Sequence, residues 1–276
     1  MSSSGNDNVR SGNPIIVYPD GVSHDFAGHG SNASVGILND HEVLKYAILL
    51  DLSACDETTT KHAKYRMKLS AETLEREKDV YRRLGSHPNI VQYLEISDKG
   101  IRLEYIKNGT LRNRLQSHAD DEPIKLAWAR QVTSALQYLH QHDIFWADLS
   151  ARNCLVTDDL TIKVCDFGGS SLGDQKEMVG EKTRYYLVHG VGLMRNASFS
   201  TELFALGSLF YEIMTNQQPY PDLEDREIER LYQMKQYAPL QLVKNEIMRD
   251  VVARCWHGAY RTCAEVLMAL PVADPA

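Results

Sequence analysis

Asp148-Leu-Ser-Ala-Arg-Asn153 and Asp166-Phe-Gly168 are the two stretches of this sequence that decide its fold. The residues between them, 154–165, consist of two apolar runs on either side of Asp158-Asp159, which predicts a β-hairpin. A hairpin returns the chain to the point where it started. We therefore expect the end of the first stretch and the start of the second to lie close together.

This arrangement would gather three side chains with oxygen acceptors. Asn153 and Asp166 would offer an amide and a carboxylate oxygen, which Mg²⁺ prefers as a hard cation. Asp148 would lie where it can orient a hydroxyl group and accept its proton. Phosphoryl transfer from ATP needs these parts, together with a cover and a cation for the phosphates.

The first half of the chain contains candidates for the cover and the cation. Gly28-His-Gly30-Ser-Asn-Ala33-Ser-Val35 is a glycine-rich stretch, and glycines let a hairpin backbone approach phosphates closely. Lys45 follows in the next apolar run and would touch the phosphates, with Glu77 as its candidate partner. Taken singly, a simple turn and solvated charged side chains explain these residues as well. The ordered set, ending in Asp148, Asn153 and Asp166, favours the phosphoryl-transfer interpretation.

The order of expected elements predicts an α+β chain. Short strands separated by one helix predominate from Val17 to about Ile106, and helices predominate from Leu111 onward. The one helix of the first part should begin at the N-cap Ser70 and end near Gly85. We accordingly expect a flexible segment at 1–14, a small sheet lobe at 15–106 and a larger helical lobe at 107–276.

Composition narrows the class of protein. The net charge of −7 argues against a broad nucleic-acid-binding face. No apolar run approaches the length of a membrane span, and the first 14 residues lack the apolar core of a secretory signal. The five cysteines have no C-x-x-C spacing, so we expect reduced thiols in an intracellular protein of the cytoplasm or nucleus.

With these residues in place, the chain resembles the eukaryotic protein-kinase superfamily from about Asp20 to Leu270. His87-Pro-Asn-Ile-Val91 and Leu103-Glu-Tyr105 strengthen the match. The loop from Asp148 to Asn153 resembles the tyrosine-kinase and tyrosine-kinase-like version of the catalytic loop. With Phe204-Ala-Leu-Gly-Ser208, it is similar to divergent small kinases of filamentous fungi.

The resemblance implies a two-lobed protein-kinase fold and a role for each matched position. Lys45 and Glu77 would form an ion pair, Asp148 would be the catalytic base, and Asn153 and Asp166 would bind Mg²⁺. The resemblance also implies an ATP pocket, whose expected lining is Gly28, Gly30, Val35, Val43, Lys45, Leu103, Glu104, Ile106 and Leu155.

The sequence departs from the family next to the catalytic aspartate, where Trp146-Ala147 replaces His-Arg. The histidine is mainly architectural, and Trp146 would substitute for it by packing. The missing arginine normally grips a phosphorylated activation loop. We therefore expect activity that does not depend on phosphorylation of that loop, although Ser170, Ser171 and Thr183 are candidate phosphosites.

Other departures affect substrate docking and stability. Glu202 replaces the aspartate that braces the catalytic loop in the family, and His189-Gly190 would stand at the Pro-Glu positions of the closing Ala-Pro-Glu. Serine/threonine kinases usually carry a lysine where this chain has Ser150, and Arg152 stands at the compensating position of tyrosine kinases. His140, at a helix end, is expected at the surface or in a role at the helix dipole.

The expected function is an ATP- and Mg²⁺-dependent protein kinase acting on a protein hydroxyl, with serine or threonine favoured over tyrosine. Two alternatives stay open. One is a pseudokinase that serves as a nucleotide-binding scaffold or regulator, and the other is an atypical kinase or ATPase of the kind found in tRNA-modification complexes. The sequence predicts no oligomeric state.

Overall fold

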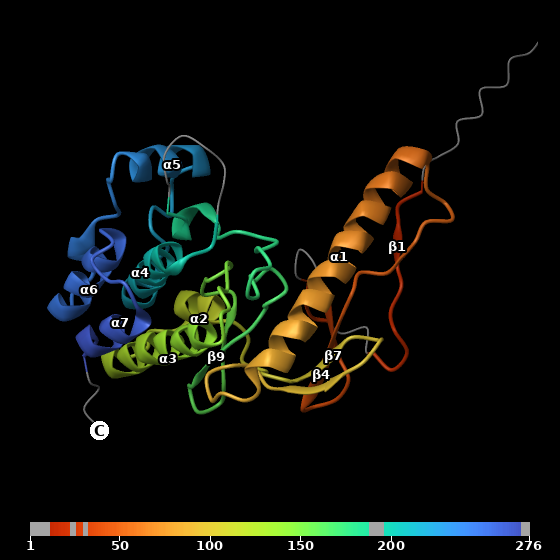
Figure 1. Ribbon diagram of the computed structural model, residues 1–276, viewed down its shortest axis with the longest axis horizontal. Coiled ribbons are helices and arrows are strands. Elements are labelled where there is room, and N and C mark those ends of the chain that lie inside the picture. Colours follow the sequence, from red (N-terminus) through yellow and green to blue (C-terminus); the bar gives the residue numbers. More distant parts are fainter. Residues whose placement is uncertain (1–11, 23–25, 30–32, 188–195, 272–276) are drawn as a thin grey trace, which may run out of the picture. The chain divides into compact units, whose positions relative to one another are not determined.

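A computed structural model describes residues 12–22, 26–29, 33–187 and 196–271 of the chain (Figure 1). The chain divides into two compact units. We call residues 1–75 with 94–105 the sheet unit, and residues 76–93 with 106–276 the helical unit. Each is described by itself.

The sheet unit is built on a five-stranded sheet in the order β2-β3-β4-β7-β6. Neighbouring strands pair antiparallel from β2 through β3 and β4 to β7. The strands are β2 (Phe26–His29), β3 (Ser34–Ile37), β4 (Glu42–Tyr46), β6 (Tyr93–Ile96) and β7 (Ile101–Glu104). The strands β1 (Ile15–Ile16) and β5 (Leu50–Asp51) form a separate two-stranded antiparallel sheet.

The long helix α1 (Glu57–Leu84) begins 13 residues before the predicted start at Ser70. Asp56 caps it, because its carboxylate accepts a hydrogen bond from the amide of Thr59 at 2.7 Å. Ser70 lies inside the helix, fully buried, and its hydroxyl accepts a hydrogen bond from the Ile48 amide at 2.8 Å. The prediction was wrong because residues 57–69 are mostly polar and show little apolar periodicity. The predicted end was right: α1 stops at Leu84, and Gly85 takes the left-handed conformation with φ +68°.

Helices with capped ends form the helical unit. Side chains of Thr110, Ser198, Asn245 and Thr262 accept hydrogen bonds from the first turns of four of them. Helices α4 and α6 pack together, as do α3 and α7 (Figure 1). The helices are α2 (Leu111–Ser117), α3 (Glu122–Gln141), α4 (Phe199–Thr215), α5 (Asp225–Gln233), α6 (Glu246–Trp256) and α7 (Cys263–Ala269).

The hairpin predicted between the two deciding stretches is confirmed. Strands β8 (Cys154–Val156) and β9 (Ile162–Val164) pair antiparallel, with Cys154 opposite Val164. The amide of Val91 donates to the carbonyl of Val164 at 3.0 Å, which ties the hairpin to the segment that follows α1. The α+β class expected from the order of elements is also confirmed. None of the helices in the described part of the chain is long and apolar enough to cross a membrane.

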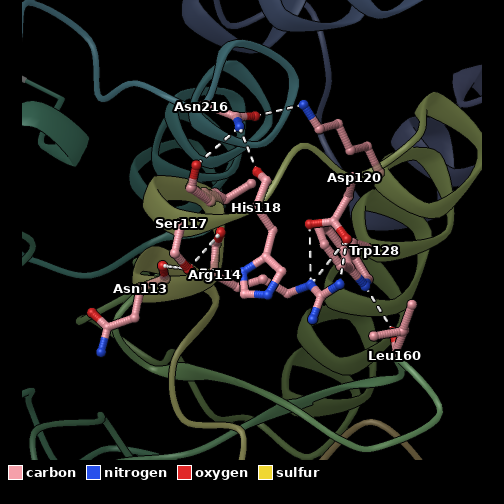
Figure 2. A network of polar contacts seen from close by, with 10 residues as sticks. Asn113, Arg114, Ser117, His118, Asp120, Trp128, Leu160 and Asn216 are labelled. Atoms are coloured by element: carbon pink, nitrogen blue, oxygen red, sulfur yellow. Dashed lines mark hydrogen bonds and ion pairs between the residues drawn. The ribbon is translucent and has the colours of Figure 1, made fainter.

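A polar network joins α2, α3 and the end of α4 (Figure 2). Asn216, the left-handed C-cap of α4, donates to the carbonyls of Leu115 and His118 at 2.9 and 3.2 Å. The guanidinium group of Arg114 donates hydrogen bonds to both carboxylate oxygens of Asp120, whose side chain is only 4% exposed. The indole of Trp128, fully buried in α3, donates to the Leu160 carbonyl at 2.7 Å. The network thus joins three helices of the helical unit to one another and, through Leu160, joins α3 to the hairpin between residues 154 and 164.

Replacing Asp120 with alanine should destabilise the fold, because it leaves the largely buried Arg114 guanidinium, 17% exposed, without its carboxylate. We expect a loss of about 2–3 kcal/mol in the free energy of unfolding, somewhat less than for a fully buried pair. Urea unfolding measures this, with Asp222→Ala as the exposed control. A loss equal to that of the control would show that the pair contributes no net stability.

Candidate active site

The loop that follows α3 holds Asp148 in a fixed orientation. The amide nitrogen Nδ2 of Asn153 donates both to the carbonyl of Asp148, at 2.8 Å, and to its Oδ2, at 3.0 Å. The other carboxylate oxygen, Oδ1, is buried and has no hydrogen-bond partner. One oxygen of the carboxylate is thus used to orient the side chain, and the other can accept a hydrogen bond from a bound hydroxyl.

The surroundings of Asp148 make it a stronger base than an ordinary aspartate. Burial raises its pKa, and the nearby carboxylate of Asp166 raises it further. The hydrogen bond from Asn153 and the positive charges of Lys182 and Arg152 act in the opposite direction. A raised pKa brings a general base closer to the pH at which it works.

The loop of Asp148 and the turn of Asp166 are bonded to each other. The indole Nε1 of Trp146 donates to the Asp166 carbonyl at 3.1 Å, and the amide of Cys165 donates to the Asn153 carbonyl at 2.9 Å. The hydroxyl of Ser170 donates to the Trp146 carbonyl at 3.0 Å. The sequence suggested only a packing role for Trp146. The structure shows that its indole also donates a hydrogen bond to the turn of Asp166.

Phe167 packs between two aromatic residues from different segments. Its ring centroid lies 6.0 Å from that of Trp146 and 5.4 Å from that of Tyr81 in α1. All three side chains are fully buried. The ring contacts fix the conformation of the turn that carries Asp166.

Glu202 holds the catalytic loop from α4. Its Oε1 accepts a hydrogen bond from the Ala147 amide at 2.8 Å, and its Oε2 lies 2.6 Å from Nε2 of His140. The side chain of His140 is 5% exposed. The expected surface position of His140 was therefore wrong, because its side chain is buried against Glu202, although the residue does lie in the last turn of α3.

In the sheet unit, the strand register brings most of the expected nucleotide-binding residues together. Val35 is opposite Lys45, Val43 is opposite Leu103, and Gly28 is opposite Val35. Lys45 is 6% exposed, so its stem is buried in the sheet. Gly100 allows this arrangement, because a Cβ at its φ of +148° would lie 2.2 Å from the Lys45 carbonyl oxygen.

The remaining expected residues are divided between the units. Glu77, Ile106 and Leu155 belong to the helical unit with Asp148, Asn153 and Asp166, whereas Lys45 and Glu104 belong to the sheet unit. The Lys45–Glu77 ion pair and the complete adenine pocket therefore stay predictions. Gly30 and His189-Gly190 lie outside the described residues.

The donor set at the Asp166 turn fits a hard cation. Because Asn153 uses its nitrogen on Asp148, its amide oxygen is available as a ligand. The carboxylate of Asp166 is close enough to Asp148 to act on its charge. An amide oxygen and a carboxylate are ligands that Mg²⁺ accepts, with water and phosphate oxygens completing its shell.

The sequence did not reveal a clamp on the segment after Gly168. Arg112 in α2 pairs with Glu212 in α4 at 2.9 Å and bonds to the phenol of Tyr185 at 2.6 Å; Tyr185 in turn donates to Glu212. Tyr185 belongs to the short 3-10 helix η1 (Thr183–Tyr185). A carboxylate inside the apolar run of α4 was a signal for such a buried pair, but its partner could not be read from the sequence.

A second arginine holds the same segment nearer its start. Arg76 in α1 donates to the carbonyl of Ser170 and to that of Lys176, the latter at 2.9 Å. Ser170 is fully buried and Ser171 nearly so; the Ser171 hydroxyl accepts from the Phe145 amide at 3.1 Å. The hydroxyls of both serines are therefore engaged, which argues against their phosphorylation in this conformation.

Glu181 is a buried carboxyl group in this segment. It is 4% exposed, and its Oε1 has no hydrogen-bond partner. Burial raises its pKa to about 8, and the carboxylates of Glu202 and Asp148 contribute to the increase. Glu181 is thus protonated near neutral pH, which avoids an uncompensated buried charge.

The Glu181→Gln variant tests this protonation. Because the folded-state pKa lies above the ordinary 4.5, the stability that Glu181 contributes is complete below about pH 4.5 and is lost as the pH rises through about 8. We expect the melting temperature of the wild type to fall between pH 6 and 9 relative to that of the variant. Glu224→Gln, at an exposed position, is the control. Parallel melting curves for wild type and Glu181→Gln would contradict the assignment.

The comparisons with known proteins agree with this geometry. The sequence model of the protein tyrosine and serine/threonine kinase family matches residues 51–264. A mitogen-activated protein kinase kinase kinase of Pyricularia oryzae is 31% identical over 173 residues, which are 57% of this chain and 19% of that protein.

Two Arabidopsis thaliana proteins are also similar. Mitogen-activated protein kinase kinase kinase ANP1 is 28% identical over 206 residues, or 70% of this chain and 31% of that protein. Mitogen-activated protein kinase kinase kinase 3 is 26% identical over 228 residues, or 78% of this chain and 33% of that protein. The matched part of the chain thus spans 19% to 33% of the length of these relatives. The family match covers most of the chain, which belongs to the protein tyrosine and serine/threonine kinase family and has its two-lobed α+β fold.

Proposed function

We propose that this protein is an ATP- and Mg²⁺-dependent protein kinase that phosphorylates serine or threonine. The observation that carries the proposal is the orientation of Asp148. One carboxylate oxygen is held by Asn153, and the other is buried without a partner. Such a group can orient the hydroxyl of a substrate and accept its proton as the phosphoryl group is transferred.

The other catalytic roles follow from the donors around this carboxylate. Asn153 and Asp166 would hold Mg²⁺, which, when bound, would neutralise charge on the phosphates. Lys45 would bind the phosphates in an ion pair with Glu77. The burial of Lys45 supports this role, since a buried lysine requires an anionic partner.

We propose residues 15–106 as the nucleotide-binding lobe and 107–276 as the lobe that carries the catalytic loop and the activation segment. The register that aligns Val35, Val43 and Leu103 on neighbouring strands supports a nucleotide site in the first lobe. In this proposal the backbone of Glu104 and Ile106 binds adenine, and Leu155 contacts its ring. Gly28 and Gly30 cover the phosphates.

A protein is the proposed substrate. By their names, the similar proteins of Pyricularia and Arabidopsis are kinases of kinases, and this supports a protein acceptor over a small molecule. Serine or threonine is favoured because serine/threonine kinases of the tyrosine-kinase-like group share features of the loop from Asp148 to Asn153.

We further propose that activity does not depend on phosphorylation of the activation segment. Ala147 stands where the family has the phosphate-gripping arginine. We propose that the segment is held instead by hydrogen bonds from Arg76 to its backbone carbonyls and by the bonds of Tyr185 to Arg112 and Glu212. These contacts form without any phosphate group.

Replacing Asp148 with asparagine should abolish most of the activity, because the amide cannot accept the substrate proton. We expect incorporation of phosphate into a generic protein acceptor to fall about 10²- to 10⁴-fold. Stabilisation of the variant by ATP and Mg²⁺ in thermal melts should persist. Asp174→Asn, an exposed change in the same segment, serves as the control.

The assay also separates the alternatives. Incorporation that is the same in wild type and Asp148→Asn would remove the kinase assignment. Stabilisation by ATP and Mg²⁺ without turnover in the wild type would favour a pseudokinase. ATP turnover that no protein acceptor stimulates would favour an ATPase or a kinase of a small molecule.

Phosphatase treatment of the purified protein should leave its activity within about twofold of the untreated value, because contacts that need no phosphate hold the activation segment. Mass spectrometry verifies that phosphate has been removed, and the initial rate measures activity. A kinase that requires a phosphorylated segment loses orders of magnitude on the same treatment. A large drop here would contradict the proposal.

A further inference from the structure

Phosphoryl transfer requires positive charge beside the group that is transferred, in addition to the metal. In the catalytic stretch from Asp148 to Asn153, Arg152 is the single basic residue. Ser150 is 1% exposed, and its hydroxyl has no hydrogen-bond partner. Ser150 therefore offers a substrate neither a charge nor an accessible donor, and Arg152 is the one cation that this stretch contributes.

A second positive charge comes from a different segment. The positive charges of Lys182 and Arg152 both lower the pKa of Asp148, against the effect of burial. The side chain of Lys182 is exposed. Within the described part of the chain, its ammonium group makes no hydrogen bond or ion pair, so it is available to a ligand.

Contacts on both sides of Lys182 fix its backbone next to the catalytic loop. On one side, the carboxyl of Glu181 is buried. On the other, the amide of Tyr185 donates to the Lys182 carbonyl at 2.8 Å, and the phenol of Tyr185 bonds to Arg112. The amide of Arg112 donates in turn to the Ala151 carbonyl at 3.1 Å, three residues after Asp148. A short chain of bonds thus joins the backbone of Lys182 to the catalytic loop.

We propose that Lys182 is a catalytic residue whose ammonium group binds the phosphoryl group during transfer, so that the activation segment supplies the charge that Ser150 does not. This inference rests on the proposed kinase function. In the step, the bond from the γ-phosphorus to the bridging oxygen breaks and its electron pair leaves with ADP. The substrate oxygen forms the new bond, and its proton passes to Asp148. Lys182 remains protonated throughout.

The test compares Lys182→Met and Lys182→Arg with the wild type in steady-state kinase assays. We expect kcat to fall about 100- to 1000-fold in Lys182→Met, the loss typical of one electrostatic contact to a transition state. The KM for ATP and the melting temperature should stay near the wild-type values, and Lys182→Arg should recover most of the loss. Lys176→Met, at another exposed lysine of the segment, is the matched control.

The outcomes distinguish this inference from the proposed function. If Asp148→Asn is inactive while Lys182→Met keeps kcat within about twofold of the wild type, the role of Lys182 is overturned and the kinase assignment stands. If the wild type has no activity that depends on Asp148, both fail. Loss in Lys182→Met that arginine does not rescue would also overturn the inference, because it would not depend on charge.

A double-mutant cycle tests the placement of Lys182 by Tyr185. Tyr185→Phe removes the phenol hydroxyl, keeps the ring and leaves both partners of the Arg112–Glu212 pair in place. We expect it to lower kcat at least threefold in the wild type and to have little further effect in Lys182→Met, since coupled residues are not additive. Equal losses in both backgrounds would overturn the proposed placement.

Discussion

The hydrogen bond from the Trp146 indole to the Asp166 carbonyl is the contact on which the arrangement of this site depends. Ala147 follows Trp146 directly, and Asp166 provides the accepting carbonyl. Their φ values are +62° and +66°, in the left-handed region that is unfavourable for residues other than glycine. The strain is sustained because both positions are held from outside. Glu202 accepts a hydrogen bond from the amide of Ala147, and Trp146 donates one to the carbonyl of Asp166. Strained backbone of this kind is typical of functional sites.

Two residues that depart from the family pattern, Glu202 and Trp146, both make contacts around the catalytic loop. Glutamate is one methylene longer than aspartate, and Glu202 reaches both the Ala147 amide and the buried His140. Trp146 fills the position of a smaller histidine, and its indole still donates a hydrogen bond while its ring packs on Phe167. Both departures from the family pattern are thus hydrogen-bonded to the catalytic loop or to the Asp166 turn.

The fold could be predicted from the sequence wherever local signals agreed, and the site only in part. The hairpin between Asn153 and Asp166 was predicted because its turn and its apolar runs are adjacent in sequence. The early start of α1 was missed because a polar helix face gives no apolar periodicity. The clamp of Arg112 on Glu212 and Tyr185 joins residues 73 and 100 positions apart, and one sequence without an alignment does not reveal such pairs.

The contacts of the segment after Gly168 support the proposal that this kinase works without phosphorylation of its activation segment. A phosphate orders such a segment by charge-assisted bonds to arginine, which the unmodified segment lacks. Here Arg76 and Arg112 are already engaged, one with backbone carbonyls and the other with Glu212 and Tyr185. Because Glu212 is buried, with a pKa that burial raises and Arg112 lowers, its charge depends on that arginine. In the proposed function, the described part of the segment is thus held by contacts that need no phosphate, and both arginines already have partners.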